Sequence, residues 1–276
     1  MTEPQAPATG ETVCYRHPNR PTGLRCVSCD RPICGGCSTP GSVGQFCPEC
    51  ARQRGRQRMI ATRPGTATRL RQGAPITFGI LAVTIVAYLI TQYAGDLGER
   101  VFFELVQFNE LVAAGESWRI FTPILLHATI AHILFNMYAL FQLGPAVEAR
   151  YGRASFLALY LGAAGAGGAF AFHFGRPEDV LVGASGAVFG LFGLWLHAAY
   201  KMRDTAFGRN LLSSLWISLL LNIALPFLIP GISWQGHLGG LLAGILTGEI
   251  WSRIRARQRV LVPMGLAILA VLSVML

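Results

Sequence analysis

Long runs of apolar residues, separated by short polar segments, dominate the chain from residue 76 onward. A helix needs about 20 predominantly apolar residues to cross the hydrocarbon core of a bilayer. Seven runs approach or meet that length, at residues 76–94, 130–147, 154–174, 180–200, 211–229, 232–251 and 261–276. The pattern predicts an all-α polytopic membrane protein. Six spans form a core in residues 76–251, and residues 252–276 add a basic loop and a shorter seventh transmembrane helix.

The composition agrees with this assignment. Of the 276 residues, 52% are hydrophobic and only 13% are charged, whereas charged residues make up about a quarter of a typical soluble domain. Residues 1–13 are polar and lack the apolar segment of a cleaved secretory signal. We therefore expect residues 1–13 to be disordered and the first span to direct insertion.

Basic residues set the expected orientation, because loops rich in arginine and lysine stay on the cytoplasmic side. Arginines are concentrated in a basic linker, residues 51–75, and after the second, fourth and sixth spans. We expect a multi-pass cell-membrane protein with a cytoplasmic N-terminus and an extracytoplasmic C-terminus. The net charge of +9 then reflects topology rather than nucleic-acid binding. Lys201 is the one lysine among 23 basic residues, a bias that indicates a GC-rich bacterium.

Seven cysteines and one histidine precede the spans as four pairs. These are Cys14 with His17, Cys26 with Cys29, Cys34 with Cys37, and Cys47 with Cys50. Two residues between paired ligands let one tight turn direct both at one ion, and a structural Zn²⁺ takes four nitrogen or sulfur ligands. An odd number of thiols cannot all form disulfides, and the cytoplasm is reducing. Residues 14–50 are therefore predicted to fold around two structural Zn²⁺ ions.

The spacing of these ligands is compatible with two pairings. In sequential pairing, neighbouring knuckles along the chain share one ion. The segment also resembles a B-box-type zinc finger, and interleaved pairing of that kind would place Cys14, His17, Cys34 and Cys37 on one ion. The resemblance implies a cytoplasmic protein partner for this domain, and a folded cap without a partner is the alternative.

Two polar residues stand at matching depths in the fourth and sixth predicted spans. Ser185 lies within Gly183–Gly186, and His237 lies near the start of the sixth span. Both spans enter from the outer side in the predicted topology, and each residue is about 8 Å inside. Polar residues in a span are costly, so such a coincidence indicates function. A neutral imidazole can accept the serine proton during attack on a carbonyl, so Ser185 and His237 are predicted to form a nucleophile–base dyad without a metal cofactor.

Further polar residues and glycines accompany this pair. His132 and Asn136 are one helical turn apart in the second span, where hydrogen-bond donors could stabilise the oxyanion formed when Ser185 attacks. Alternatively, they only tie this span to its neighbours. Beside His237, Gly240 and Gly244 continue a glycine stripe that lets another helix approach closely.

At these residues the chain resembles the rhomboid family of intramembrane serine proteases, from about residue 118 to residue 248. The matching motifs are the Trp-Arg pair Trp118 and Arg119, the series His127, His132 and Asn136, the Gly-x-Ser-Gly motif Gly183 to Gly186, and the final series His237, Gly240 and Gly244. The resemblance implies a rhomboid-like six-helix core. It also implies Ser185 as nucleophile, His237 as base, and an oxyanion site formed by His132, Asn136 and the Ser185 amide.

The resemblance also suggests what is cut. It implies single-span transmembrane substrates in the lipid bilayer, cleaved near their outer end. One departure concerns Gly236, where many members have alanine before the histidine.

Three other functions are weighed against this interpretation. A catalytically inactive rhomboid-like protein that binds transmembrane clients would be expected to lack Ser185 or His237, and both are present. A soluble-type hydrolase would need glycine where Ala187 stands. An intramembrane metalloprotease would need a His-Glu-x-x-His motif, which the sequence lacks.

Overall fold

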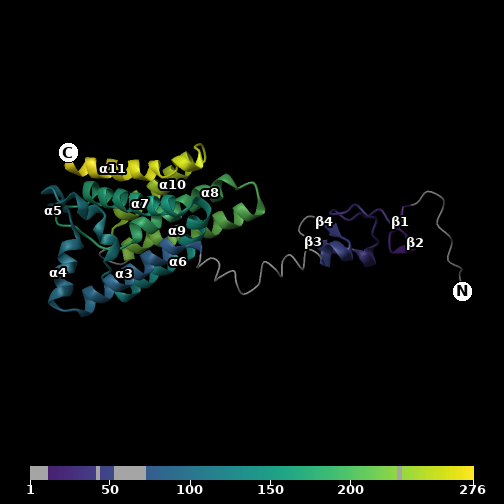
Figure 1. The fold of residues 1–276 in the computed structure, drawn as a ribbon, viewed down its shortest axis with the longest axis horizontal. Helices are drawn as coiled ribbons and strands as arrows, with labels where there is room; N and C mark the ends of the chain where they lie inside the picture. The colour runs from purple at the N-terminus through teal and green to yellow at the C-terminus, as the bar shows by residue number, and fades with distance from the viewer. Residues whose placement is uncertain (1–11, 42–43, 53–72, 229–231) are drawn as a thin grey trace. The chain divides into compact units, whose positions relative to one another are not determined.

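The computed structural model describes all residues except 1–11, 42–43, 53–72 and 229–231. The chain divides into two compact units, residues 1–69 and residues 70–276 (Figure 1). Most of the predicted disordered N-terminus, residues 1–13, and most of the predicted basic linker, residues 51–75, lie outside the described residues.

The first unit is small and has little regular structure. It contains two antiparallel strand pairs. Strand β1 (Val13–Cys14) pairs with β2 (His17–Pro21), and β3 (Thr39–Gly41) pairs with β4 (Gly44–Phe46). The short helix η1 (Gly35–Cys37) lies between the two pairs in sequence. Its buried apolar cluster consists of Ile33, Phe46 and five cysteines. Because so small a core cannot stabilise a domain by apolar burial alone, this unit needs cross-links.

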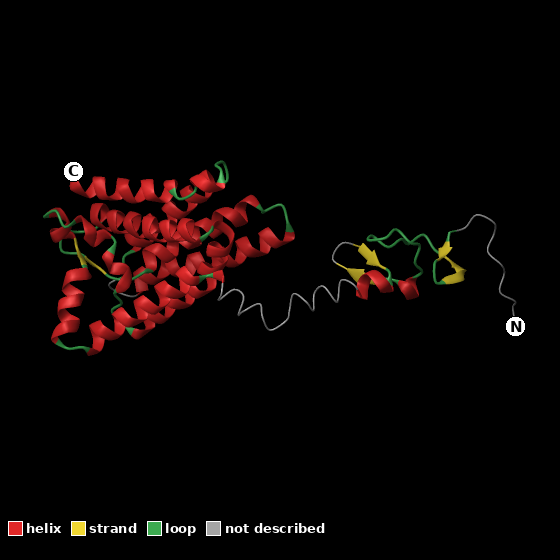
Figure 2. Ribbon diagram, viewed as in Figure 1, coloured by secondary structure: helices red, strands yellow, loops and turns green. Residues whose placement is uncertain are grey.

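The second unit is built from long helices (Figure 2). Within the described residues these are α3 (Pro75–Tyr93), α6 (Ile130–Tyr151), α7 (Arg153–Phe174), α8 (Ser185–Lys201), α9 (Ala206–Leu228), α10 (Trp234–Trp251) and α11 (Leu261–Met275). They correspond in order to the seven predicted spans. The predicted fold class, an all-α polytopic protein preceded by a small cysteine-rich domain, is confirmed.

Four helical segments of the described chain are long and apolar enough by themselves to cross a membrane. They are Pro75–Tyr93, Ile130–Tyr151, Arg153–Phe174 and Ala256–Met275, the last of which joins the short helix η4 (Ala256–Gln258) to α11. Helix α8 has 17 residues, and α10 contains Gln235, His237 and Glu249. The two helices that carry the predicted dyad are not among these four segments.

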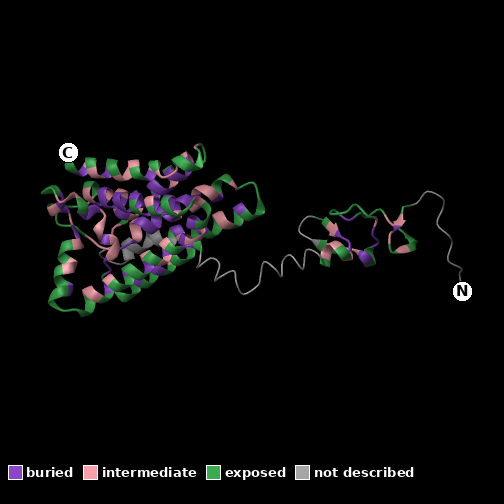
Figure 3. Cartoon of the chain, in the orientation of Figure 1, coloured by how far each residue is buried: buried purple, intermediate pink, exposed green. Residues whose placement is uncertain are grey.

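Burial separates the central helices of this unit from the outer ones (Figure 3). In α7, 67% of the most apolar window is buried, against 22% in α3 and 17% in the segment ending at α11. Helix α10 packs most extensively on α8 and on α7, so these three helices form the centre of the unit. The outer helices expose large apolar side chains such as Val83, Phe135 and Leu272, which suits a surface that faces lipid.

The segment between α3 and α6 is folded rather than a simple loop. It contains α4 (Asp96–Leu105), β5 (Gln107–Phe108), α5 (Asn109–Ala113), η2 (Ser117–Ile120) and η3 (Thr122–Leu125). Strand β5 pairs antiparallel with β6 (Val180–Leu181), which precedes α8.

This pairing corrects the predicted start of the fourth span. The apolar pattern placed that start at residue 180, but the helix begins at Ser185. Residues 180 and 181 are extended because they bond to β5. Gly183 then has φ +118°, outside the right-handed helical region, so the chain turns there before the helix begins.

Candidate active site

The site is positioned by direct backbone contact between α8 and α10. A Cβ atom added at Gly240 would overlap the carbonyl oxygen of Gly186 and lie 2.8 Å from its carbonyl carbon. One turn further, a Cβ at Gly244 would lie 2.7 Å from the carbonyl carbon of Gly190. These successive contacts show that α8 and α10 run parallel with their first turns side by side. Ser185 is the first residue of α8, and His237 is the fourth of α10.

The His237 ring is held against α8 by an aromatic contact. It stacks on Phe189 with ring centroids 4.3 Å apart and planes inclined by 11°. Phe189 follows Ser185 by one helical turn, so both project from the same face of α8. The imidazole therefore packs on the helix face that carries the serine.

In the described part of the chain, no hydrogen bond joins the Ser185 hydroxyl to the His237 imidazole, and neither side chain bonds elsewhere. Catalytic hydrogen bonds are often long or poorly aligned without substrate and tighten when it binds. The structure thus brings the two predicted residues to one level, with their side chains uncommitted to other partners.

The turn before Ser185 rests on two histidines. A Cβ at Gly183 would lie 2.6 Å from Nε2 of His132, so the histidine ring packs directly on this glycine. The His127 and His132 rings are 4.9 Å apart, and the Ala184 N–H points at Nε2 of His127 across a long 3.5 Å. Both predicted histidines therefore line the approach to the nucleophile.

The first turn of α8 offers backbone donors at the same place. The N–H of Ser185 has no hydrogen-bond partner among the described residues, as is usual for the first N–H groups of a helix. Such groups carry the positive end of the helix dipole and stabilise negative charge. Asn136 is buried one turn beyond His132, where its Nδ2 donates to the His132 carbonyl at 3.0 Å. Its amide would have to turn to reach an oxyanion.

Trp118 and Arg119 lie away from this cluster and have different surroundings. Arg119 is buried, and its Nη1 donates to the carbonyl oxygens of Phe103, Glu104 and Val106 at 2.8 to 3.0 Å. It thereby fastens the end of α4 to η2. Trp118 is half exposed. Both residues belong to the folded segment before α6 rather than to the reacting groups.

Two contributors were missed by sequence reasoning. Phe189 gave no signal, because an aromatic residue in an apolar span is ordinary. Gly167 of α7 faces both site helices: a Cβ there would lie 2.8 Å from the Gly236 carbonyl oxygen and 3.4 Å from Cα of Gly186. The richness of the third span in glycine and alanine was the available signal for this close packing.

In the first unit, the eight predicted metal ligands gather into two groups. One group is Cys14, His17, Cys34 and Cys37, and the other is Cys26, Cys29, Cys47 and Cys50, with the ligand atoms of each group within 4.8 Å of one another. This is the interleaved arrangement rather than the sequential one. Two non-adjacent knuckles share each centre, so each centre cross-links distant parts of the segment.

The spacing within each group fits a tetrahedral ion. With Zn–S bonds near 2.3 Å, two sulfurs on one zinc lie about 3.8 Å apart. The Sγ atoms of Cys29 and Cys47 are 3.8 Å apart, and Nδ1 of His17 lies 3.4 to 3.7 Å from three sulfurs. The donor set therefore fits Zn²⁺, with His17 presenting Nδ1.

Three of these thiols, those of Cys14, Cys26 and Cys34, have a pKa below the ordinary cysteine value, whereas the pKa is raised for Cys29, Cys37 and Cys50. For Cys34, burial raises the pKa, but hydrogen bonds to His17 and to the Cys37 backbone outweigh it. Burial raises the pKa of the Cys14 thiol, but hydrogen bonds to the backbone near Arg16 and Cys34 outweigh it and lower the pKa to about 6. The Cys26 thiol behaves in the same way: burial is outweighed by backbone hydrogen bonds, and its pKa falls to about 6. A thiolate is the form of cysteine that binds metal.

Fold and site together define a polytopic helical membrane protein with a serine and a histidine at the same end of two parallel, closely packed helices. Comparison with known protein families matches residues 114–254 to the rhomboid domain. Because this match covers half of the chain, the protein belongs to the rhomboid family. The predicted resemblance is confirmed for this part, whereas the B-box-type zinc finger stays a prediction.

Individual relatives agree with this assignment. The chain is 36% identical to the rhomboid protease GluP of Bacillus subtilis over 187 residues, which are 66% of this chain and 36% of GluP. It is 40% identical to the putative rhomboid protease YdcA of Bacillus subtilis over 152 residues, 55% of this chain and 75% of YdcA. Rhomboid-like protease 1 of Toxoplasma gondii is 32% identical over 149 residues, 53% of this chain and 51% of that protein. The chain thus spans only about a third of GluP.

Proposed function

We propose that this protein is an intramembrane serine endopeptidase that works through a Ser185–His237 dyad. The observation that carries the proposal is the packing of the His237 ring on Phe189, on the face of α8 that bears Ser185. The glycine contacts between α8 and α10 supply the rigidity that such a pair needs. The names of the relatives, a rhomboid protease, a putative rhomboid protease and a rhomboid-like protease, support the same proposal.

In this mechanism His237 takes the proton of the Ser185 hydroxyl as its oxygen attacks the scissile carbonyl. The acyl-enzyme forms as His237 returns the proton to the leaving amine, and water activated by the same imidazole releases the acyl product. Among the described residues no carboxylate is hydrogen-bonded to the His237 imidazole, so the mechanism uses a dyad rather than a triad.

The oxyanion is stabilised by the free Ser185 N–H and by the His132 side chain beside Gly183. A donor aimed at the developing charge is typically worth about 10²- to 10³-fold in rate. Asn136 joins as a third donor by exchanging its bond to the His132 carbonyl for one to the oxyanion. Its buried position one turn from His132 supports this role.

The substrates are single-span membrane proteins cut near the outer face. Ser185 begins α8 on the side opposite to the basic loops, and those loops are retained in the cytoplasm. The N-terminal domain then lies in the cytoplasm and the product is released outside. In that domain two Zn²⁺ ions would bind the two ligand groups and cross-link the fold, and neither takes part in catalysis.

The test is cleavage of a labelled single-span substrate by the full-length protein in liposomes. We expect Ser185→Ala and His237→Ala to abolish cleavage. As matched controls, Ser214→Ala removes an exposed hydroxyl that bonds within α9, and His173→Ala removes an exposed imidazole on α7; both should leave cleavage unchanged. Undiminished cleavage by Ser185→Ala would refute the mechanism. Binding of the substrate without any cleavage would favour an inactive client-binding protein.

A further inference from the structure

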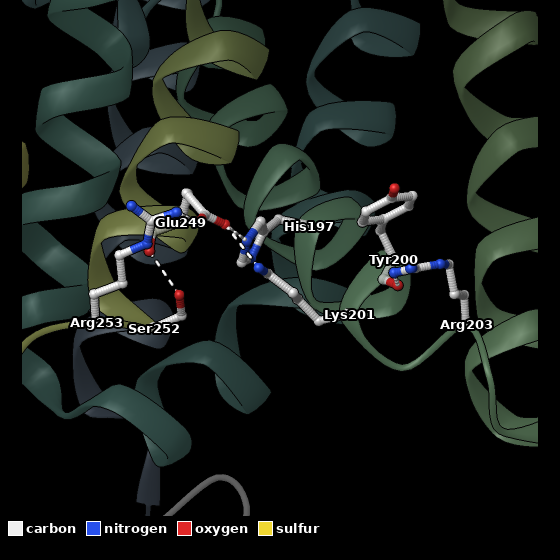
Figure 4. Close-up of polar contacts among 7 residues, drawn as sticks. All are labelled: His197, Tyr200, Lys201, Arg203, Glu249, Ser252 and Arg253. Carbon is white, nitrogen blue, oxygen red and sulfur yellow. Dashed lines mark hydrogen bonds and ion pairs between the residues drawn. The ribbon is translucent and has the colours of Figure 1, made fainter.

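At the far end of α10 from His237, one carboxylate joins the two site helices. Glu249 accepts a hydrogen bond from Nε2 of His197 at 2.8 Å, and its oxygen lies 3.1 Å from Nζ of Lys201 (Figure 4). His197 and Lys201 are one turn apart on α8, so both reach across the helix interface. Arg253 contacts the same carboxylate from just beyond the end of α10.

The contact is partly shielded from the surroundings. The His197 side chain is only 10% exposed and that of Glu249 is 29% exposed. The histidine ring also lies over Gly248, where an added Cβ would come within 2.8 Å of its Nδ1. Packing and hydrogen bonding together therefore fix where Glu249 meets α8.

The contact of Glu249 with His197 lies at the same distance along both helices from the Ser185–His237 pair. Glu249 follows His237 by 12 residues, and His197 follows Ser185 by 12 residues. At 1.5 Å per residue, each interval is about 18 Å of helix. Because α8 and α10 run parallel, the Glu249–His197 contact and the Ser185–His237 pair occupy equivalent levels at opposite ends of the interface.

The interface between these two ends combines glycines packed on carbonyl groups, such as Gly240 on Gly186 and Gly244 on Gly190, with apolar side chains such as Phe189 and Leu241. Such contacts bring the backbones close and restrict how the helices shift, but none of them is a charged or hydrogen-bonded side-chain contact that favours one register by its direction. A slide of one residue would displace His237 by about 1.5 Å and turn its side chain by about 100°. A directional contact at the far end opposes that movement.

We propose that Glu249 is a positioning residue: held by His197 and Lys201, it sets the register of α10 on α8 and so the place of His237 relative to Ser185. The catalytic consequence rests on the proposed peptidase function. Arg253 is four residues from Glu249 in the same chain segment, and its printed contact does not cross to α8, so it does not itself link the two helices.

The kinetic test compares Glu249→Gln with Arg253→Gln in the full-length protein in liposomes. Glutamine has nearly the same shape as glutamate but no negative charge, so it can no longer offer a carboxylate to both His197 and Lys201 of α8. It should lower kcat about 10-fold with KM unchanged, since displacements near 1 Å can cost up to about 100-fold. Arg253→Gln should stay within about 2-fold of wild type. The exchanged pair Lys201→Glu with Glu249→Lys should recover most of the activity that Glu249→Lys alone loses.

A second measurement reads the register without catalysis. Amide hydrogen exchange should become faster in the first turns of α8 and α10 in Glu249→Gln, and not in Arg253→Gln. Unchanged exchange in Glu249→Gln, or equal kcat losses in the two variants, would overturn the positioning role. A wild-type protein that cleaves nothing would refute the peptidase function instead, and the exchange result would still decide whether Glu249 sets the register.

Discussion

Replacing Gly240 with alanine tests whether close approach of α8 and α10 creates the active site. The new Cβ would lie 2.8 Å from the carbonyl carbon of Gly186 and overlap its oxygen. Carbon atoms pack best at 3.5 to 4.0 Å, so the contact with the carbonyl carbon alone requires the two helices to separate by about 0.7 to 1.2 Å, and the overlap with the oxygen requires more. The atom that blocks them is backbone, which cannot rotate away as a flexible side chain could.

The expected result is a loss of kcat by about 100-fold, because a misplacement near 1 Å between reacting groups has that effect. Alanine is a better helix former than glycine by about 1 kcal/mol, so local helix stability would favour the variant. A loss of activity must therefore arise at the interface. The assay is cleavage of a labelled single-span substrate in liposomes, with kcat and KM measured separately.

Gly236→Ala is the matched control, one turn earlier on the same helix and next to His237. A Cβ there would meet its nearest atoms, in Leu181 and Ser233, at 3.5 Å, which is ordinary contact. We expect near-normal kcat, in keeping with the alanine that many rhomboid proteins carry at this position. Near-normal kcat in Gly240→Ala, or an equal loss in both variants, would refute the reasoning.

Three further predictions concern other parts of the molecule. The buried carboxylate of Glu148 accepts hydrogen bonds from the N–H groups of Ile76 and Thr77. Glu148→Gln should therefore lower the free energy of unfolding by about 2 kcal/mol, measured by thermal unfolding in detergent. An unchanged melting temperature would contradict this prediction. Cys34→Ser should reduce bound zinc from two ions per chain to one by elemental analysis, and retention of both would disprove the proposed ligand set. Asn136→Ala should lower kcat about 100-fold with little change in KM, and a rise in KM alone would exclude an oxyanion role.

Much of the architecture could be predicted from local pattern alone. Apolar runs located the seven helices, because a span must be about as long as the bilayer is thick. The start of α8 could not be found in this way. Val180 and Leu181 are as apolar as the helix that follows, and only their pairing with β5 shows that they are extended.

For the candidate sites too, some features could be predicted from the sequence and others required the fold. Spacing made Ser185 and His237 candidates, since polar residues at matching depths stand out against apolar spans. Ligand spacing predicted the cysteine knuckles, which do gather into two groups. Which knuckles share an ion required the fold, because Cys14 and Cys34 become neighbours only after the chain has turned back on itself.

The sequence by itself therefore determined which residues can do chemistry and where the helices run, because both depend on residue types and on spacing along the chain. The tertiary structure alone decided that His237 stacks on Phe189 and that Glu249 reaches His197, since each pair joins residues about fifty positions apart. Such contacts depend on the rotation and register of packed helices. An apolar pattern does not specify these to within a single residue.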